Sequence, residues 1–198
     1  MLSPNLVSKL APAILLAAVV ILPGCSINVK DKNKDGESRV DIKTPMGDLH
    51  VNEQPDVKET GLTVYPGAKP AAKDISSDKK SANVNISAGG FSLKVVAAEF
   101  QSDDPSEKIL AYYNKELQHF GKPIECHGRW SGGDVNTELG KKNGSKPVSC
   151  GTHENGESIE LKVGTDDNQH VVAVKPDGKG THFALVYVRA HTGSEDTI

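Results

Sequence analysis

A cluster of acidic side chains is the closest approach to a catalytic group in this sequence. Asp103, Asp104 and Glu107 lie together, and neighbouring carboxylates are suited to general acid–base chemistry. The same residues stand at the start of a predicted helix, where capping and the helix dipole already favour acidic side chains. The seven histidines are scattered, without an H-E-x-x-H motif or a pair spaced i, i+4. We therefore predict no catalytic residue.

Composition and motifs exclude several classes of function. The 23 Lys and Arg residues against 26 Asp and Glu residues leave a formal net charge of -3, so no basic field is available to hold nucleic acid. Neither a G-x-S-x-G elbow nor a P-loop appears. The 198 residues, 36% of them hydrophobic and 5% aromatic, suit one domain with a modest core. We expect no nucleic-acid partner and no cofactor.

The N-terminal segment predicts export rather than a membrane span. Lys9 is followed by an apolar run from Leu10 to Leu22. These 13 positions are fewer than the roughly 20 apolar residues that a helix needs to cross a bilayer. A basic start, a short apolar stretch and small residues before a cut are typical of a signal peptide, here residues 1–24.

The end of this segment, "LPGC" from Leu22 to Cys25, resembles the lipobox of bacterial lipoproteins. The resemblance implies that Cys25 becomes the first mature residue and carries acyl groups such as palmitate. Two or more acyl chains give a stable membrane anchor. Ser26 follows, and a residue other than Asp at that place resembles the pattern for export to the outer membrane, facing the periplasm, in Gram-negative cells. A plain secretory signal with an incidental Cys is the alternative.

An acidic string after Cys25 has part of a calcium-binding pattern. Asp31, Asn33 and Asp35 alternate ahead of a Gly, which resembles the start of an EF-hand loop. That loop ends in a bidentate Glu at its twelfth position, where this sequence has Ile42, and three basic residues lie close by. A flexible, solvated tether at 25–39 is the better interpretation, with the three alternating residues as weak metal candidates.

The cysteine count predicts a disulfide. Three cysteines are an odd number, which is awkward for an exported protein unless one has another role. If Cys25 carries lipid, Cys126 and Cys150 remain as a pair in a compartment where disulfides persist. Two free thiols, or a metal site with His127 and His153, are the alternatives. No C-x-x-C is present, and the spacings match no common zinc module.

Hydrophobic patterns outline the remaining elements. Asp104 as N-cap, Pro105 at the first helical position and Gly121 after the end predict a helix at about 105–120. Its apolar stripe, which predicts packing on a sheet, is Ile109, Leu110, Tyr113, Leu117 and Phe120. Alternation and turn residues predict strands within 40–52, at about 62–65, 82–88 and 91–101, and in "PIECHGRW", "SIELKVG", "QHVVAVKP" and "HFALVYVRA".

These elements predict an α+β fold with a mainly antiparallel sheet, one principal helix and a disulfide staple. The segments "VYPGA" and "DDPSEKILAYYNKEL" are similar to segments of uncharacterised bacterial lipoproteins, a resemblance that implies no activity. The expected organisation is a signal peptide at 1–24, a lipidated Cys and tether at 25–39, a hairpin and linker at 40–60, a single domain at 61–191 and a disordered tail at 192–198.

A non-catalytic module that binds an envelope partner is the leading functional hypothesis. Trp130, the only Trp, follows Arg129 in an expected loop, and an exposed Trp beside an Arg suits a binding surface. A Trp that covers the disulfide is the preferred interpretation of Trp130, and the binding patch is the alternative. We expect a membrane-anchored envelope lipoprotein with a non-catalytic binding or structural role and an envelope protein or glycan as partner. The alternative is an extracytoplasmic hydrolase or metal-dependent enzyme, with His127 or His153 converging with carboxylates in a cleft.

The lipobox generates a direct prediction. Replacing Cys25 with Ala removes the thiol that would be acylated, so the Cys25→Ala protein should incorporate no labelled fatty acid and should leave the membrane fraction. Metabolic labelling and membrane fractionation measure these two effects. Unchanged membrane retention of the variant would contradict the assignment.

Overall fold

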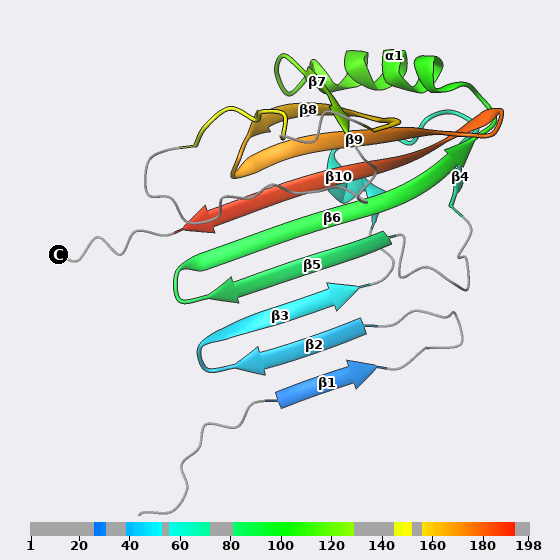
Figure 1. Cartoon of the computed structure of the whole chain (residues 1–198). Coiled ribbons are helices and arrows are strands. Elements are labelled where there is room, and N and C mark those ends of the chain that lie inside the picture. Colours follow the sequence, from blue (N-terminus) through cyan, green and yellow to red (C-terminus); the bar gives the residue numbers. More distant parts are fainter. Residues whose placement is uncertain are drawn as a thin grey trace, which may run out of the picture.

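One antiparallel sheet organises the described part of this computed structural model, which comprises residues 26–30, 39–52, 56–71, 81–128, 145–151 and 156–192. Within those residues the strands pair in the order β1-β2-β3-β5-β6-β10-β9-β8-β7, with β4 beside β6 (Figure 1). The strands are β1 Ser26–Lys30, β2 Arg39–Thr44, β3 Gly47–Asn52, β4 Lys69–Pro70, β5 Ser81–Ala88, β6 Phe91–Ser102, β7 Ile124–Gly128, β8 Ser158–Thr165, β9 Asn168–Asp177 and β10 Gly180–Thr192. The predicted mainly antiparallel sheet is confirmed.

Tight turns connect neighbouring strands. Gly89 and Gly90 join β5 to β6 with φ of 50° and 82°, and two positive φ values suit a two-residue hairpin. Gly47 closes the turn between β2 and β3, where a Cβ atom would lie 2.1 Å from the Ser87 carbonyl oxygen of β5. Glycine therefore lets the first hairpin lie against β5. The hairpin predicted within 40–60 is confirmed, and the strands predicted at 82–88 and 91–101 pair as a second hairpin in the same sheet.

Strands β6 and β10 form the centre of the sheet and pair without interruption from Phe91 and Thr192 to Ser102 and Thr181. Because side chains alternate along a strand, this pair contributes to a core on each face. Two odd-numbered residues of β10, Phe183 and Leu185, belong to the larger hydrophobic cluster. Even-numbered residues of the same strand, Ala184, Val186 and Val188, belong to the smaller cluster on the other face.

Helix α1, Ser106–Leu117, covers the larger cluster over β8, β9 and β10 (Figure 1). Ile109, Tyr113 and Leu117 are fully buried in that cluster. The ring of Tyr113 lies 5.6 Å from the ring of Phe183 on β10. The single predicted helix is present, and its contacts reach only this half of the sheet.

The helix ends three residues before the predicted boundary, and the chain that follows it packs against His170 of β9. The ring of Phe120 is 42% exposed rather than part of a buried stripe, and it stacks on His170 with centroids 3.9 Å apart. Nδ1 of His170 lies 2.9 Å from the Thr60 carbonyl oxygen. Burial lowers the pKa of His170, against the opposing effect of this hydrogen bond. The neutral ring therefore donates its Nδ1 proton to Thr60.

The predicted strand at 62–65 is wrong, because the backbone there bonds to a side chain. The Tyr113 hydroxyl donates to the Thr63 carbonyl oxygen at 3.1 Å and accepts from the Tyr65 amide at 3.0 Å. Leu62 is buried in the larger cluster. The segment after the short 3-10 helix η1, Val57–Thr60, is thus fastened to α1 rather than to a sheet ladder.

The segment interpreted as a tether begins with a strand. Ser26–Lys30 forms β1 and pairs with β2 in the register Ile27 to Ile42. Without β1, the backbone groups on the outer side of β2 would be unpaired, and β1 supplies their hydrogen-bond partners. The sheet therefore starts at the residue directly after Cys25.

The double role of the Tyr113 hydroxyl generates a stability prediction. Tyr113→Phe leaves the Tyr65 amide and the Thr63 carbonyl without their partner, which should cost about 1–3 kcal/mol of unfolding free energy. Tyr112→Phe on the same helix is the matched control and should change stability by less than about 0.5 kcal/mol. Urea unfolding measures both variants, and equal effects would contradict this role for Tyr113.

Candidate functional site

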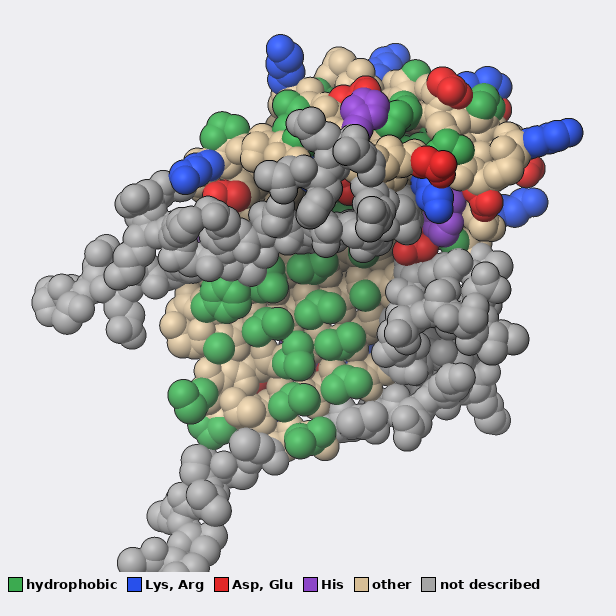
Figure 2. Space-filling model, viewed as in Figure 1, with side chains coloured by type: hydrophobic (Ala, Val, Ile, Leu, Met, Phe, Trp, Pro, Cys, Tyr) green, Lys and Arg blue, Asp and Glu red, His purple; other side chains and the backbone are tan. Residues whose placement is uncertain are grey.

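An aliphatic surface covers one face of the outer half of the sheet. Pairing aligns every second residue of β2, β3, β5 and β6 on this face. Figure 2 shows hydrophobic side chains gathered over these strands. We call this surface the aliphatic face and define it as Val40, Ile42, Leu49, Val51, Val84, Ile86, Leu93 and Val95.

The aliphatic face consists of two rows that cross the strands. Both rows are built of cross-strand pairs, which stabilise a sheet when the partners are apolar. Two residues along each strand separate them, so the rows run about 7 Å apart. One row is Ile42, Leu49, Ile86 and Leu93, and the other is Val40, Val51, Val84 and Val95, which pairs with Val188 of β10. The second row continues into the smaller core at β10.

The reverse side of the same strands is polar. Asp41 Oδ1 and His50 Nδ1 lie 2.6 Å apart across β2 and β3. Lys94 Nζ on β6 lies 2.7 Å from a carboxylate oxygen of Glu59 in η1, and Asn83 Nδ2 donates to the other oxygen at 3.1 Å. The outer half of the sheet is therefore amphipathic, with a polar side that is stable in water.

The described elements leave the aliphatic face open. Helix α1 contacts β8 to β10, and η1 contacts β6 and β10, both on the side of the larger cluster. All eight side chains of the aliphatic face are half-buried rather than buried. Ile27, which pairs with Ile42 at the sheet edge, is 67% exposed. This contiguous apolar surface is therefore the candidate interaction site of the described residues.

A shallow hollow of about 490 Å³ lies between the β2–β3 and β5–β6 turns. Met46 and Phe91 are among the residues that line it, and Met46 is 83% exposed. Asp48 is the one ionisable side chain among the described residues of its wall. General acid–base chemistry needs a partner for that carboxylate, so the hollow offers no such pair.

The acidic cluster at the helix start has a structural role. Asp104 accepts hydrogen bonds from Lys108 Nζ at 2.7 Å and from the Tyr65 hydroxyl at 3.0 Å. The bond from Lys108, followed by that from Tyr65, holds the pKa of Asp104 below its ordinary value. The prediction of Asp104 as N-cap is wrong, since Pro105 holds that position and the helix begins at Ser106. The Asp104 side chain instead bonds to α1 and to the segment before β4.

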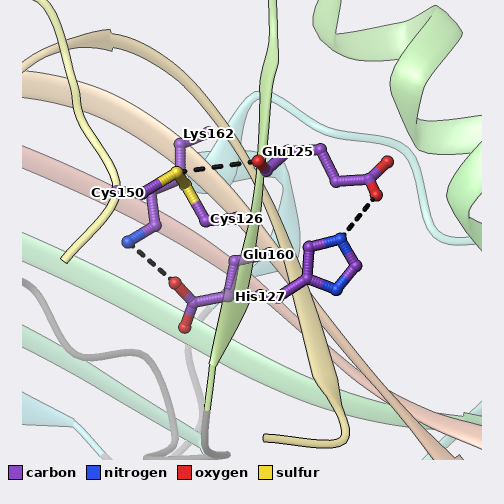
Figure 3. The surroundings of a disulfide bond; sticks show 6 residues. All are labelled: Glu125, Cys126, His127, Cys150, Glu160 and Lys162. Carbon is purple, nitrogen blue, oxygen red and sulfur yellow. Dashed lines mark hydrogen bonds and ion pairs between the residues drawn. A yellow bond between two sulfur atoms is a disulfide. The ribbon is translucent and has the colours of Figure 1, made fainter. Parts of the chain in front are cut away.

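The disulfide fastens the sheet edge at β7 (Figure 3). Cys126 and Cys150 are bonded, with Cα atoms 5.3 Å apart, which confirms the predicted pair. Cys150 Sγ lies 3.6 Å from the Glu125 carbonyl oxygen, and because a disulfide sulfur has no proton, this is a contact rather than a hydrogen bond. Cys126 pairs in register with Glu160, whose carboxylate lies 2.7 Å from Lys162 Nζ.

The Glu160–Lys162 ion pair is part of the structural support of this edge. The two side chains are only 12% and 9% exposed. A charge left alone at such a position is strongly destabilising, so each residue needs the other. We therefore interpret the Glu160–Lys162 pair as a structural feature beside the disulfide rather than as a reactive group.

The segment 145–151 is fastened at both ends. Cys150 holds one end to β7, and at the other end Ser145 and Thr165 donate hydrogen bonds to Asp167. The bond from Ser145, followed by that from Thr165, lowers the pKa of Asp167. A backbone bridge from Pro147 to Thr165 places the segment along the outer side of β8, beyond the end of β7.

The histidine proposed for a metal site lies beside a single carboxylate. His127 Nε2 is 3.0 Å from Glu125 Oε1, and both side chains are more than half exposed. Within the described ranges, no group of three or more His, Cys, Asp or Glu side chains converges. The other candidates from the sequence lie outside the described residues: Cys25, Asp31, Asn33, Asp35, Arg129, Trp130 and His153.

Comparison with known proteins assigns no family. No family model, curated protein or solved structure matches the chain. In the part of the chain that the structure describes, no helix is long and apolar enough to cross a membrane.

The aliphatic face was not predicted, although the sequence contains a signal for it. In "RVDIK", "DLHVN", "NVNIS" and "SLKVV" aliphatic residues occupy every second position, with mostly polar residues between them. Four such strands predict a sheet with one apolar face and one polar, solvated face. A single predicted helix is too little to cover that apolar face as well as the rest of the sheet.

The disulfide generates a stability prediction. Converting Cys126 and Cys150 to Ser together should lower the unfolding free energy by about 3 kcal/mol, because the loop between them is no longer closed in the unfolded chain. Urea unfolding of the chain from residue 26 onward measures the loss. Reductant should lower the stability of the unsubstituted protein to the same level and leave the double variant unchanged. A reductant effect on the double variant would contradict this account.

Proposed function

We propose that the protein is a lipid-anchored lipoprotein of the bacterial cell envelope with a non-catalytic binding role, and that the aliphatic face is its binding surface. The observation that carries this proposal is the aliphatic face itself. It is contiguous over four strands, half-buried, and open among the described elements. The "LPGC" sequence at Leu22 to Cys25 supports the envelope address.

The chemistry of the described side chains also favours binding over catalysis. Asp104, the residue best placed for acid–base work in the sequence, is bonded to Lys108 and Tyr65. Its lowered pKa keeps it ionised at neutral pH, whereas a general acid or base is most effective with a pKa near the working pH. In this proposal α1 is the structural cover of one half of the sheet, and the uncovered half receives the partner.

Protection of the aliphatic face in native membranes tests the proposal. Ile42→Cys puts a thiol on the aliphatic face, and Lys43→Cys puts one on the polar side of the same strand. If a partner covers the face, a water-soluble maleimide should label position 42 severalfold more slowly in isolated envelopes than in purified protein. Position 43 should label at the same rate in both. Equal rates for position 42 in envelopes and in purified protein would contradict the proposal.

A further inference from the structure

We infer that the partner of the aliphatic face is the acyl layer of the membrane that holds the protein, so that the outer half of the sheet lies flat on the bilayer. The inference rests on the proposed function and names the partner of the same surface. It follows from the position of the anchor, the two-sided chemistry of the sheet and the size of the face.

The anchor residue adjoins the sheet. Cys25 is bonded to Ser26, the first residue of edge strand β1. In the sequence, Cys25 precedes Ile27 by two residues. Ile27 is 67% exposed and pairs in register with Ile42, where the first aliphatic row begins. A lipid on Cys25 therefore holds the start of the apolar rows at the membrane surface.

The outer half of the sheet has the chemistry of an interfacial element. All eight side chains of the aliphatic face are uncharged Val, Ile or Leu, while Asp41, His50 and Lys94 lie on the reverse side. Amphipathic elements at a membrane bury their apolar side about 5–10 Å deep and keep the polar side in water. Strands β2, β3 and β5 each have a neighbour on both sides, so their backbone groups are satisfied in an apolar medium.

The size of the face favours a bilayer over a second protein. Four strands and two rows give a projected area of roughly 260 Å², from spacings of about 4.8 Å between strands and about 6.8 Å between rows. A standard protein interface buries about 800 Å² on each partner. Contact with a bilayer needs less buried area, because the lipid anchor already holds the aliphatic face at a high effective concentration relative to the membrane.

Quenching by brominated lipid tests the contact. The full-length lipid-anchored protein is reconstituted in vesicles of phosphatidylethanolamine and phosphatidylglycerol with brominated acyl chains, which quench tryptophan on contact. Ile42→Trp and Ile86→Trp report on the aliphatic face, and Lys43→Trp and Ser87→Trp are the matched controls on the polar side. The signal of Trp130 is subtracted with the unsubstituted protein. Quenching at both aliphatic positions should exceed that at the controls severalfold.

The possible results of the quenching and labelling experiments lead to different conclusions. Equal quenching on the two sides, or quenching at position 42 without position 86, overturns the flat contact. Protection of position 42 in native envelopes without quenching in vesicles overturns the membrane contact and leaves the binding surface with another partner. Loss of both signals overturns the proposed function as well. If circular dichroism shows that Ile86→Trp does not fold, Val84→Trp reports from the same strand and face.

Discussion

The register between β6 and β10 is the constraint on which the rest of the structure depends. A slip of one residue would turn every side chain of one strand to the opposite face. In the observed register, Phe100 stands opposite Phe183 on the side of the helix, and Val95 stands opposite Val188 on the other. The Gly89–Gly90 turn fixes the register of β5 against β6, and the pairing of β3 with β5 fixes the register of the first hairpin. The aliphatic face is thus set by pairing at the centre of the sheet.

Side chains alternate between the two faces in both halves of the sheet, but the faces differ in chemistry from one half to the other. In the half around β8, β9 and β10 both faces carry apolar side chains, and one face is sealed by Ile109, Tyr113 and Leu117 of α1. In the half around β2, β3 and β5 only one face is apolar, and no described element lies over it. The first half supplies the folded core, and the second half supplies a surface whose free energy falls when something apolar covers it.

Local signals made much of the fold predictable. Gly89–Gly90, the helical stripe around Tyr113 and the parity of the cysteines each act over short stretches or by counting, and the hairpin, the helix and the disulfide followed from them. The segment after Leu62 could not be predicted, because its backbone bonds to a hydroxyl 48 and 50 residues away. The aliphatic face was missed for a similar reason. Alternation within a strand does not say which strands are neighbours, and β3 and β5 are separated by the residues of η1 and β4.

The two edges of the sheet end in different ways. An edge strand is a template for adding further strands, and a sheet with two bare edges can grow from both. At the β7 side, the disulfide and the bridge from Pro147 to Thr165 lay a short irregular segment along the outer strands. At the other side β1 is only five residues long, and the proposed anchor directly precedes it. A lipid there would act as a steric stop, so that the attachment that localises the protein would also end the growth of its sheet.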